Sequence, residues 1–328
     1  MNLRTFGGSP ATVSEVGLGC WQFGGDAWGD VPEADALATL HTAADAGVTF
    51  LDTADVYGLG RSEELIGRFL RERRGPFFVA TKLGRFPQPG LPANGTPAAI
   101  RQHTEASLKR LGVETLDLTQ LHCVPPAFLE RGDVFDTLRQ LQREGKIRRF
   151  GASVESAAEA KICLAQGGLA SLQVIFSIFR QMPATAFFDE AQRKGVSIIV
   201  RLPLASGLLA GKYTANTTFA ANDHRSFNAN GEKFNVGETF AGLGFERGRE
   251  LAEKLRPLVP TGFTMPQLAL RWCLDFPAVT TIIPGARNPE QARANAAASA
   301  LPRLSEELHA KLREFYRSDV APHVRGPD

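Results

Sequence analysis

Four side chains that can move protons or hold charge lie in three consecutive segments of the chain. Asp52 ends an apolar run that begins at Val48, and Tyr57 follows five residues later. Lys82 and His122 each end a further run of the same kind. Short runs rich in β-branched and aromatic residues are typical of buried strands. A carboxylate, a phenol, an ammonium and an imidazole placed in this way favour reversible reduction of a carbonyl group.

The chemistry depends on how these groups change one another's acidity. A tyrosine is a poor acid near neutral pH because its unperturbed pKa is about 10. A nearby ammonium favours the phenolate, so we expect Lys82 to lower the pKa of Tyr57. Asp52 would supply the counter-charge that a buried lysine needs, and His122 would donate to the carbonyl oxygen. No side chain supplies a hydride, so this reaction requires a cofactor.

Strand-like and helix-like segments alternate eight times along the chain. Strands are expected, after an N-terminal hairpin around residues 7–8, at 16–21, 48–51, 77–82, 116–122, 148–153, 172–176, 196–201 and 280–283. Helices are expected at 33–46, 61–73, 97–111, 133–144, 156–166, 184–194, 245–255 and 265–276. Because parallel strands need long helical crossovers, this pattern predicts an α/β fold, a single (β/α)8 TIM-barrel domain over residues 1–328. The strand ends of such a barrel converge on the face that holds the active site.

A long segment after the seventh strand, residues 206–240, interrupts the pattern. It is rich in Gly, Asn, Phe and Thr and has neither helical nor strand periodicity. Long irregular loops inside compact domains are usually either functional lids or poorly ordered. The sequence leaves both possibilities open for this loop.

Composition excludes several classes of protein. Of the 328 residues, 43% are hydrophobic and 22% charged, and the formal net charge of +2 gives no reason to expect nucleic acid or an anionic membrane as a partner. The four cysteines form no CxxC pair, which favours reduced thiols in a cytoplasmic protein. The N-terminus lacks the apolar core of a signal peptide, and no apolar run is long enough to cross a bilayer. The histidines show no HxH or HExxH spacing, so we expect no metal centre.

A second candidate site follows the eighth strand. Pro284 and Gly285 lead to a helix that begins near Asn288, with Arg287 just before it. Barrels often bind phosphate at such an extra helix, and a forked guanidinium suits a phosphate monoester. On these residues alone, a capped surface helix is the alternative. No GxGxxG motif follows a strand, so a Rossmann dinucleotide site is not indicated.

Together, these motifs resemble the aldo-keto reductase superfamily across nearly the whole chain. The matching segments are 17–21 (GLGCW), 50–58 (FLDTADVYG), 80–82, 108–113, 116–122, 145–153, 203–212 and 283–287. The resemblance implies a (β/α)8 barrel that uses NADPH to reduce aldehydes or ketones to alcohols. It further implies that Tyr57 is the general acid and base, that Lys82 and Asp52 tune it, and that His122 orients the carbonyl.

The resemblance also assigns residues to the cofactor. Ser153 and Gln173 would hold the nicotinamide carboxamide, and Asn295 would lie at the adenine. The pyrophosphate would contact Pro203, Leu204, Ser206, Gly207 and Lys212, and the 2′-phosphate would contact Arg287 and Gln291. Further cofactor contacts are expected at Gly19, Cys20, Trp21, Asp52, Arg201, Pro284 and Gly285. For the small carbonyl substrate we expect contacts with Trp21, Tyr57, Phe86 and His122.

Two further aromatic residues are candidates for the substrate pocket, and three positions depart from the family pattern. Trp28 and Phe179 are candidates for the apolar wall of the substrate pocket, with core or loop packing as the alternative. Val154 stands where many members have Asn, Arg201 where many have an aromatic residue, and Ala294 where a Glu commonly precedes Asn295. None of the three is a catalytic position, so we expect activity to be retained.

Two other functions remain open at the level of sequence. The chain would be a Schiff-base lyase if Lys82 acted as a nucleophile toward a carbonyl substrate. It would be a regulatory or sensor protein if the barrel bound NADPH without transferring hydride. The physiological substrate and the oligomeric state are not readable from the sequence.

Overall fold

Eight parallel strands form the centre of the computed structural model, which describes residues 1–327. They are β3 (Leu18–Gly19), β4 (Phe50–Asp52), β5 (Phe78–Leu83), β6 (Leu118–His122), β7 (Phe150–Ser153), β8 (Leu169–Ile175), β9 (Ser197–Arg201) and β10 (Val279–Ile282). Each strand pairs with its neighbour in chain order, and parallel bridges from Val16 to Ile282 and from Gly19 to Gly285 join the first strand to the last. The predicted (β/α)8 barrel is therefore confirmed.

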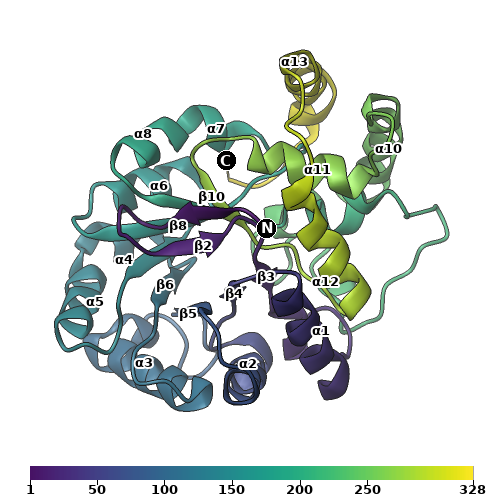
Figure 1. Ribbon diagram of the computed structural model, residues 1–328. Helices are drawn as coiled ribbons and strands as arrows, with labels where there is room; N and C mark the ends of the chain where they lie inside the picture. Colours follow the sequence, from purple (N-terminus) through teal and green to yellow (C-terminus); the bar gives the residue numbers. More distant parts are fainter. Residues whose placement is uncertain (328) are drawn as a thin grey trace.

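Helices surround the strands on the outside of the barrel (Figure 1). Those predicted from the sequence are α1 (Glu33–Asp45), α2 (Arg61–Glu72), α3 (Pro97–Leu111), α5 (Asp133–Arg143), α6 (Ala157–Leu164), α10 (Phe245–Leu255), α11 (Met265–Leu274) and α12 (Pro289–Ala296). The local signals explain their ends: α3 begins after Thr96, whose side chain accepts a hydrogen bond from Ala99 N, and it ends at Gly112 with φ of 68°.

The prediction of one continuous helix over residues 184–194 is wrong. The segment consists of α7 (Met182–Ala186) and α8 (Phe188–Arg193), separated by Phe187, whose φ of −156° and ψ of −3° lie outside the helical region. Outside residues 206–240, two α-helices were not predicted, α4 (Pro126–Arg131) and α13 (Glu306–Phe315). The first is too short to show a period, and the second buries only Leu312 and Phe315.

The predicted N-terminal hairpin closes one end of the barrel. Its strands, β1 (Leu3–Thr5) and β2 (Thr12–Ser14), are antiparallel and cross the barrel in Figure 1. Phe6 is fully buried, with its ring 4.7 Å from Phe78 and 5.9 Å from Phe50, which begin β5 and β4. Because the hairpin covers the starts of the strands, only the opposite end, where the strands finish, is left for a site.

The long segment after β9 is folded against the barrel mouth. It contains a 3-10 helix (Ala205–Ala210), α9 (His224–Phe227) and two short 3-10 helices (Val236–Glu238 and Phe240–Gly242). The Ser206 hydroxyl donates to Glu238 O and accepts from Phe240 N, both at 3.1 Å. The backbone of Asp223 forms an isolated antiparallel β-bridge with that of Trp28. These contacts hold the segment against the rest of the barrel mouth.

All four cysteines are free, as their spacing predicted. Across residues 1–327, none of the helices combines the length and the apolar character needed to cross a membrane.

Candidate active site

The ammonium of Lys82 is the centre of the predicted catalytic group. Its Nζ lies 2.6 Å from Asp52 Oδ1, 2.8 Å from Thr53 O and 3.3 Å from the hydroxyl of Tyr57. These contacts occupy its three hydrogen-bonding directions. Lys82 is 1% exposed, so the pair that it forms with Asp52 is shielded from water. The pairing of β4 with β5 brings the two side chains together, because their strands are adjacent and parallel.

A tight turn after β4 aims Tyr57 back at Lys82. Asp55 N donates to Lys82 O and Tyr57 N donates to Ala54 O, which holds the turn against β5. Gly58 follows with φ of 60° and lies so close to the neighbouring loop that a Cβ there would collide with the backbone of Gly24. Glycine is therefore required at this position, both for its conformation and for the close approach.

Asp52 is held from a second side by Gln173 on β8. The amide Nε2 of Gln173 donates to Asp52 Oδ2 at 2.7 Å, while Lys82 occupies Oδ1. The sequence predicts that Gln173 contacts the cofactor, but it does not predict the hydrogen bond to Asp52. The available signal was a polar side chain inside the apolar strand at residues 169–175, which indicates a polar partner within the barrel.

His122 ends β6 beside Tyr57, and the two rings meet edge to face at 5.8 Å. Its Nδ1 is buried and has no hydrogen-bond partner among residues 1–327. Burial, together with the cations Arg85, Lys82 and Arg201, lowers the pKa of His122 well below its usual value. The ring is therefore neutral and keeps one N–H for a carbonyl oxygen.

The acidity of Tyr57 differs from the sequence expectation. Burial raises its pKa to about 12, and the nearby Lys82 ammonium only partly offsets this effect. Lys82 itself loses stability as a cation through burial, but Asp52 and Tyr57 outweigh the loss and raise its pKa. The expected pull of Lys82 on the phenol is present; the expected net lowering of the pKa is wrong, because desolvation of the phenolate is larger. Tyr57 is thus a protonated donor next to a fixed cation.

These groups open into a cavity of about 680 Å³ that extends over the barrel mouth. Tyr57, His122 and Asp52 line one part of it. Most of the residues that the sequence analysis assigned to the cofactor also line it: Gly19, Trp21, Asp52, Gln173, Arg201, Pro203, Leu204, Ser206, Gly207, Lys212, Pro284, Gly285, Arg287, Gln291 and Asn295. The volume is within the range of protein sites for cofactors and other small ligands.

The loop after β9 gives the cavity wall features suited to phosphate groups. After β9, Ala205, Ser206 and Gly207 have φ of 48°, 54° and 93°, a strained backbone of the kind concentrated at ligand sites. Lys212 and Arg287 add positive charge to the same wall. A fold that places cations and a strained, close-turning loop in one cavity can hold an anionic nucleotide.

Hydrogen bonds within the segment brace the start of α12. Asn288 caps the helix by accepting from Gln291 N at 2.9 Å, and Gln291 Oε1 accepts from Arg287 N at 2.9 Å. Asn295 Nδ2 donates to Gly285 O at 3.1 Å, which fixes the loop from β10 to the helix. The three predicted residues of this segment therefore act as one unit.

Known proteins provide the deciding comparison. The Aldo/keto reductase family model matches residues 15–317. The protein belongs to the aldo/keto reductase family. Its relatives include the NADH-specific methylglyoxal reductase of Escherichia coli, which is 32% identical over 314 residues, covering 89% of this chain and 91% of that protein.

Solved aldo-keto reductases have the same fold. The holo form of aldo-keto reductase AKR11C1 from Bacillus halodurans is 28% identical, covers 96% of each chain and gives a TM-score of 0.78. An aldo-keto reductase from Klebsiella pneumoniae in complex with NADPH is 26% identical, covers 96% of each chain and gives a TM-score of 0.69. The (β/α)8 fold of this reductase is therefore a known architecture.

Besides the buried Lys82, three predicted site residues of this reductase do not lie on the cavity wall. Cys20 is fully buried, with Sγ 3.5 Å from Leu18 O, and Ser153 is 2% exposed and accepts from Cys123 Sγ at 3.5 Å. Phe86 instead packs on the His103 ring at 5.4 Å.

The two other aromatic candidates, Trp28 and Phe179, lie in different surroundings. Trp28 lies on the cavity wall, 5.6 Å from the Trp21 ring, which favours a role in the pocket. Phe179 is fully buried and packs near Phe315, as the alternative of core packing predicts.

Proposed function

We propose that this aldo-keto reductase uses NADPH to reduce aldehydes or ketones, with Tyr57 as the proton donor. The observation that carries the proposal is the 3.3 Å contact between Tyr57 OH and Lys82 Nζ, beside His122 in one cavity. A phenol that stays protonated through neutral pH and a neutral imidazole N–H are both donors, as a carbonyl oxygen requires.

The bound cofactor supplies the hydride that reaches the carbonyl carbon. The residues do the rest. The His122 N–H holds the carbonyl oxygen, and Tyr57 gives its phenolic proton to that oxygen as negative charge develops there. Lys82 then stabilises the phenolate that remains, while Asp52 keeps Lys82 charged. In the reverse direction, the phenolate would accept the proton of an alcohol.

Arg287 and Gln291 are proposed to select NADPH over NADH. Both lie at the start of α12 on the cavity wall, where a guanidinium suits the 2′-phosphate. Both nucleotides occur among the relatives. The Klebsiella protein was solved with NADPH, and the E. coli protein is NADH-specific. The choice therefore has to be made by residues such as these.

The lyase alternative is disfavoured by the state of Lys82. A Schiff base forms from a neutral amine, whereas Lys82 contacts three oxygens, one of them a buried carboxylate, and its pKa is raised. A sensor without catalysis would have no need for the protonated Tyr57 at this position.

NADPH consumption with a panel of aldehydes, ketones and quinones tests the proposed function. We expect turnover with part of the panel, and we expect Tyr57→Phe to bind NADPH with unchanged affinity while its kcat falls by about 100-fold or more. Binding of NADPH without turnover of any carbonyl compound would instead support the sensor alternative.

We further propose a cytoplasmic location, which the four free thiols favour.

A further inference from the structure

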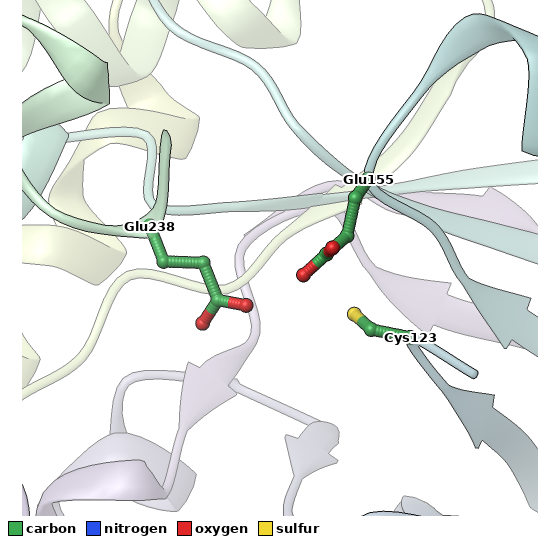
Figure 2. Close-up of side chains that lie close together, drawn as sticks. All are labelled: Cys123, Glu155 and Glu238. Atoms are coloured by element: carbon green, nitrogen blue, oxygen red, sulfur yellow. The ribbon is translucent and has the colours of Figure 1, made fainter. Parts of the chain in front are cut away.

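A cluster of buried charges adjoins His122 at the barrel mouth. Glu238, from the loop after β9, accepts a hydrogen bond from Arg85 Nη1 at 3.1 Å and lies 3.4 Å from Arg201 Nη1. Arg85 follows β5 and Arg201 ends β9, so three separate segments converge here. Figure 2 shows Glu238 together with Glu155, which follows β7, and Cys123, which follows β6.

The two carboxyl groups of this cluster carry less than two negative charges. The carboxyl groups of Glu155 and Glu238 have oxygens within 4.8 Å of each other, and the repulsion between two carboxylates this close in a shielded site favours a proton on one of them. Burial and the neighbouring Glu238 raise the pKa of Glu155 to about 7, whereas Arg201 and Arg85 overcome burial to hold that of Glu238 at about 2. With the proton on Glu155, two guanidinium groups share one carboxylate.

A metal ion is a poor occupant of this cluster. The ligand atoms of Cys123, Glu155 and Glu238 lie within 4.8 Å of one another, which is close enough for coordination. Yet Arg201 Nη2 is 3.6 Å from Cys123 Sγ, and both arginines contact the carboxylate that would have to bind the ion. Two guanidinium groups repel a cation and attract an anion.

The backbone conformation of Cys123 directs its side chain into this cluster. Alternation along the strand predicts that Cys123 faces away from His122. Cys123 lies one residue past the end of β6 with φ of 48°, so strand alternation no longer governs it, and its sulfur lies beside Arg201 at the mouth.

We propose that Arg85 binds a carboxylate of the carbonyl substrate and thereby makes this reductase selective for acidic aldehydes or ketones. The inference rests on the proposed function and specifies its substrate class. Arg85 is more exposed than its two ionic neighbours, with 25% of its side chain accessible against 11% for Arg201 and 5% for Glu238. Glu238 is its one hydrogen-bond partner among residues 1–327, so further N–H donors remain for a ligand.

The surrounding aromatic rings provide room for the body of such a substrate. Arg85 lies over the Phe234 ring at 5.5 Å, Phe234 lies 6.0 Å from Trp21, and Trp21 stacks on Tyr57 at 5.8 Å. All four side chains line the same cavity. A flat apolar molecule can therefore present its carbonyl to Tyr57 while its other end reaches the guanidinium.

The charge balance favours an anion at this end. Lys82 is paired with Asp52, and Arg201 shares Glu238 with Arg85. Asp26, another carboxylate on the cavity wall, is exposed and bonds to Gly58 N, so water screens it. A buried excess of positive charge is unfavourable until a counter-ion arrives, and a substrate carboxylate supplies one with the geometry that guanidinium prefers.

An aromatic aldehyde that carries a carboxylate, compared with its methyl ester, tests the inference in the NADPH-loaded protein. We expect kcat/KM for 4-carboxybenzaldehyde to exceed that for its methyl ester by about 10-fold or more. Arg85→Gln should lower kcat/KM for the acid by about 10- to 100-fold and for the ester by less than about 3-fold, since one charge-assisted contact is lost. Arg85→Lys should restore part of the preference. Arg101→Gln, which removes an exposed guanidinium paired with Glu144, should leave both values unchanged.

Other outcomes overturn the inference. Equal turnover of acid and ester by the wild type would show that no anion site operates, while ester reduction would leave the proposed function intact. Equal losses with both probes in Arg85→Gln would make Arg85 a structural residue only. Reduction of neither probe and of no other carbonyl compound would refute both proposals. Should Arg85→Gln not fold, inhibition of ester reduction in the wild type decides: 4-methylbenzoate should inhibit at least about 10-fold more strongly than 4-methylbenzamide, and equal inhibition would refute the site.

Discussion

Gln173 Nε2 donates a hydrogen bond of 2.7 Å to Asp52 Oδ2, and this bond connects two strands of the barrel that are not neighbours. The other oxygen of Asp52 accepts from Lys82 at 2.6 Å. Each carboxylate oxygen therefore has a donor of its own, which fixes the plane of the carboxylate and the position of the ammonium. Through Lys82, the amide on β8 sets the surroundings of the Tyr57 hydroxyl.

Replacing that amide should loosen the catalytic group. In Gln173→Leu, Asp52 Oδ2 would lose its donor inside the barrel, which we expect to lower the free energy of unfolding by about 1–3 kcal/mol. We also expect kcat to fall by about 10-fold because Lys82 is less firmly placed. Urea unfolding and steady-state kinetics measure the two effects. Gln192→Leu, at an exposed site on α8, is the matched control, and an unchanged kcat in Gln173→Leu would contradict the coupling.

The raised pKa of Tyr57 predicts how the rates depend on pH. A phenol with a pKa of about 12 stays protonated at neutral pH, so reduction of an uncharged carbonyl compound should not decline through loss of this proton between about pH 6 and about pH 9. Alcohol oxidation requires the phenolate and should rise with pH over the same interval. Profiles of kcat/KM in both directions provide the measurement. A reduction rate halved near pH 8 by titration of Tyr57 would contradict the assignment.

Removing Arg287 should affect one nucleotide more than the other. We expect Arg287→Ala to raise the Kd of NADPH by about 10- to 100-fold and that of NADH by less than about 3-fold, because only NADPH carries the 2′-phosphate. Titration by cofactor fluorescence measures both constants. Arg293→Ala changes an exposed arginine of α12 that does not line the cavity, and it should alter neither. Equal effects of Arg287→Ala on both nucleotides would remove the phosphate assignment.

Glu155 should make the stability of the protein depend on pH. Its folded pKa of about 7 lies above the ordinary value of 4.5, so the folded state binds more protons than the unfolded state between these values. The contribution of Glu155 to stability is therefore present at low pH and is lost as pH rises through about 7, by no more than about 1.4 kcal/mol per pH unit. The groups facing it are Glu238, Arg201 and Arg85.

Glu155→Gln should remove this slope, because an amide does not titrate. Relative to the wild type, the variant should gain stability between about pH 5 and about pH 8, by up to about 2.5 kcal/mol. Urea unfolding at both pH values, with Glu159→Gln on the adjoining helix as the comparison, provides the measurement. Parallel pH dependence of Glu155→Gln and the wild type would show that the proton is not held there.

The sequence by itself determined the barrel and brought the proposed catalytic residues to one end of it. A buried strand followed by a polar residue is a local pattern, and eight such patterns separated by helical periods admit few arrangements. Asp52, Lys82 and His122 lie on consecutive strands, so their convergence follows from the order of the chain alone. The cap and glycine signals of α3 are local in the same sense.

The tertiary structure decided what depends on residues far apart in the chain. Gln173 and Asp52 are separated by 121 positions, and Arg85 and Glu238 by 153, so no local pattern indicates that they touch. The pKa of Tyr57 likewise depends on how much water the folded mouth excludes, which the sequence does not specify. Local periodicity sets strands and helices, whereas burial and long-range contacts set the charges that give the site its chemistry.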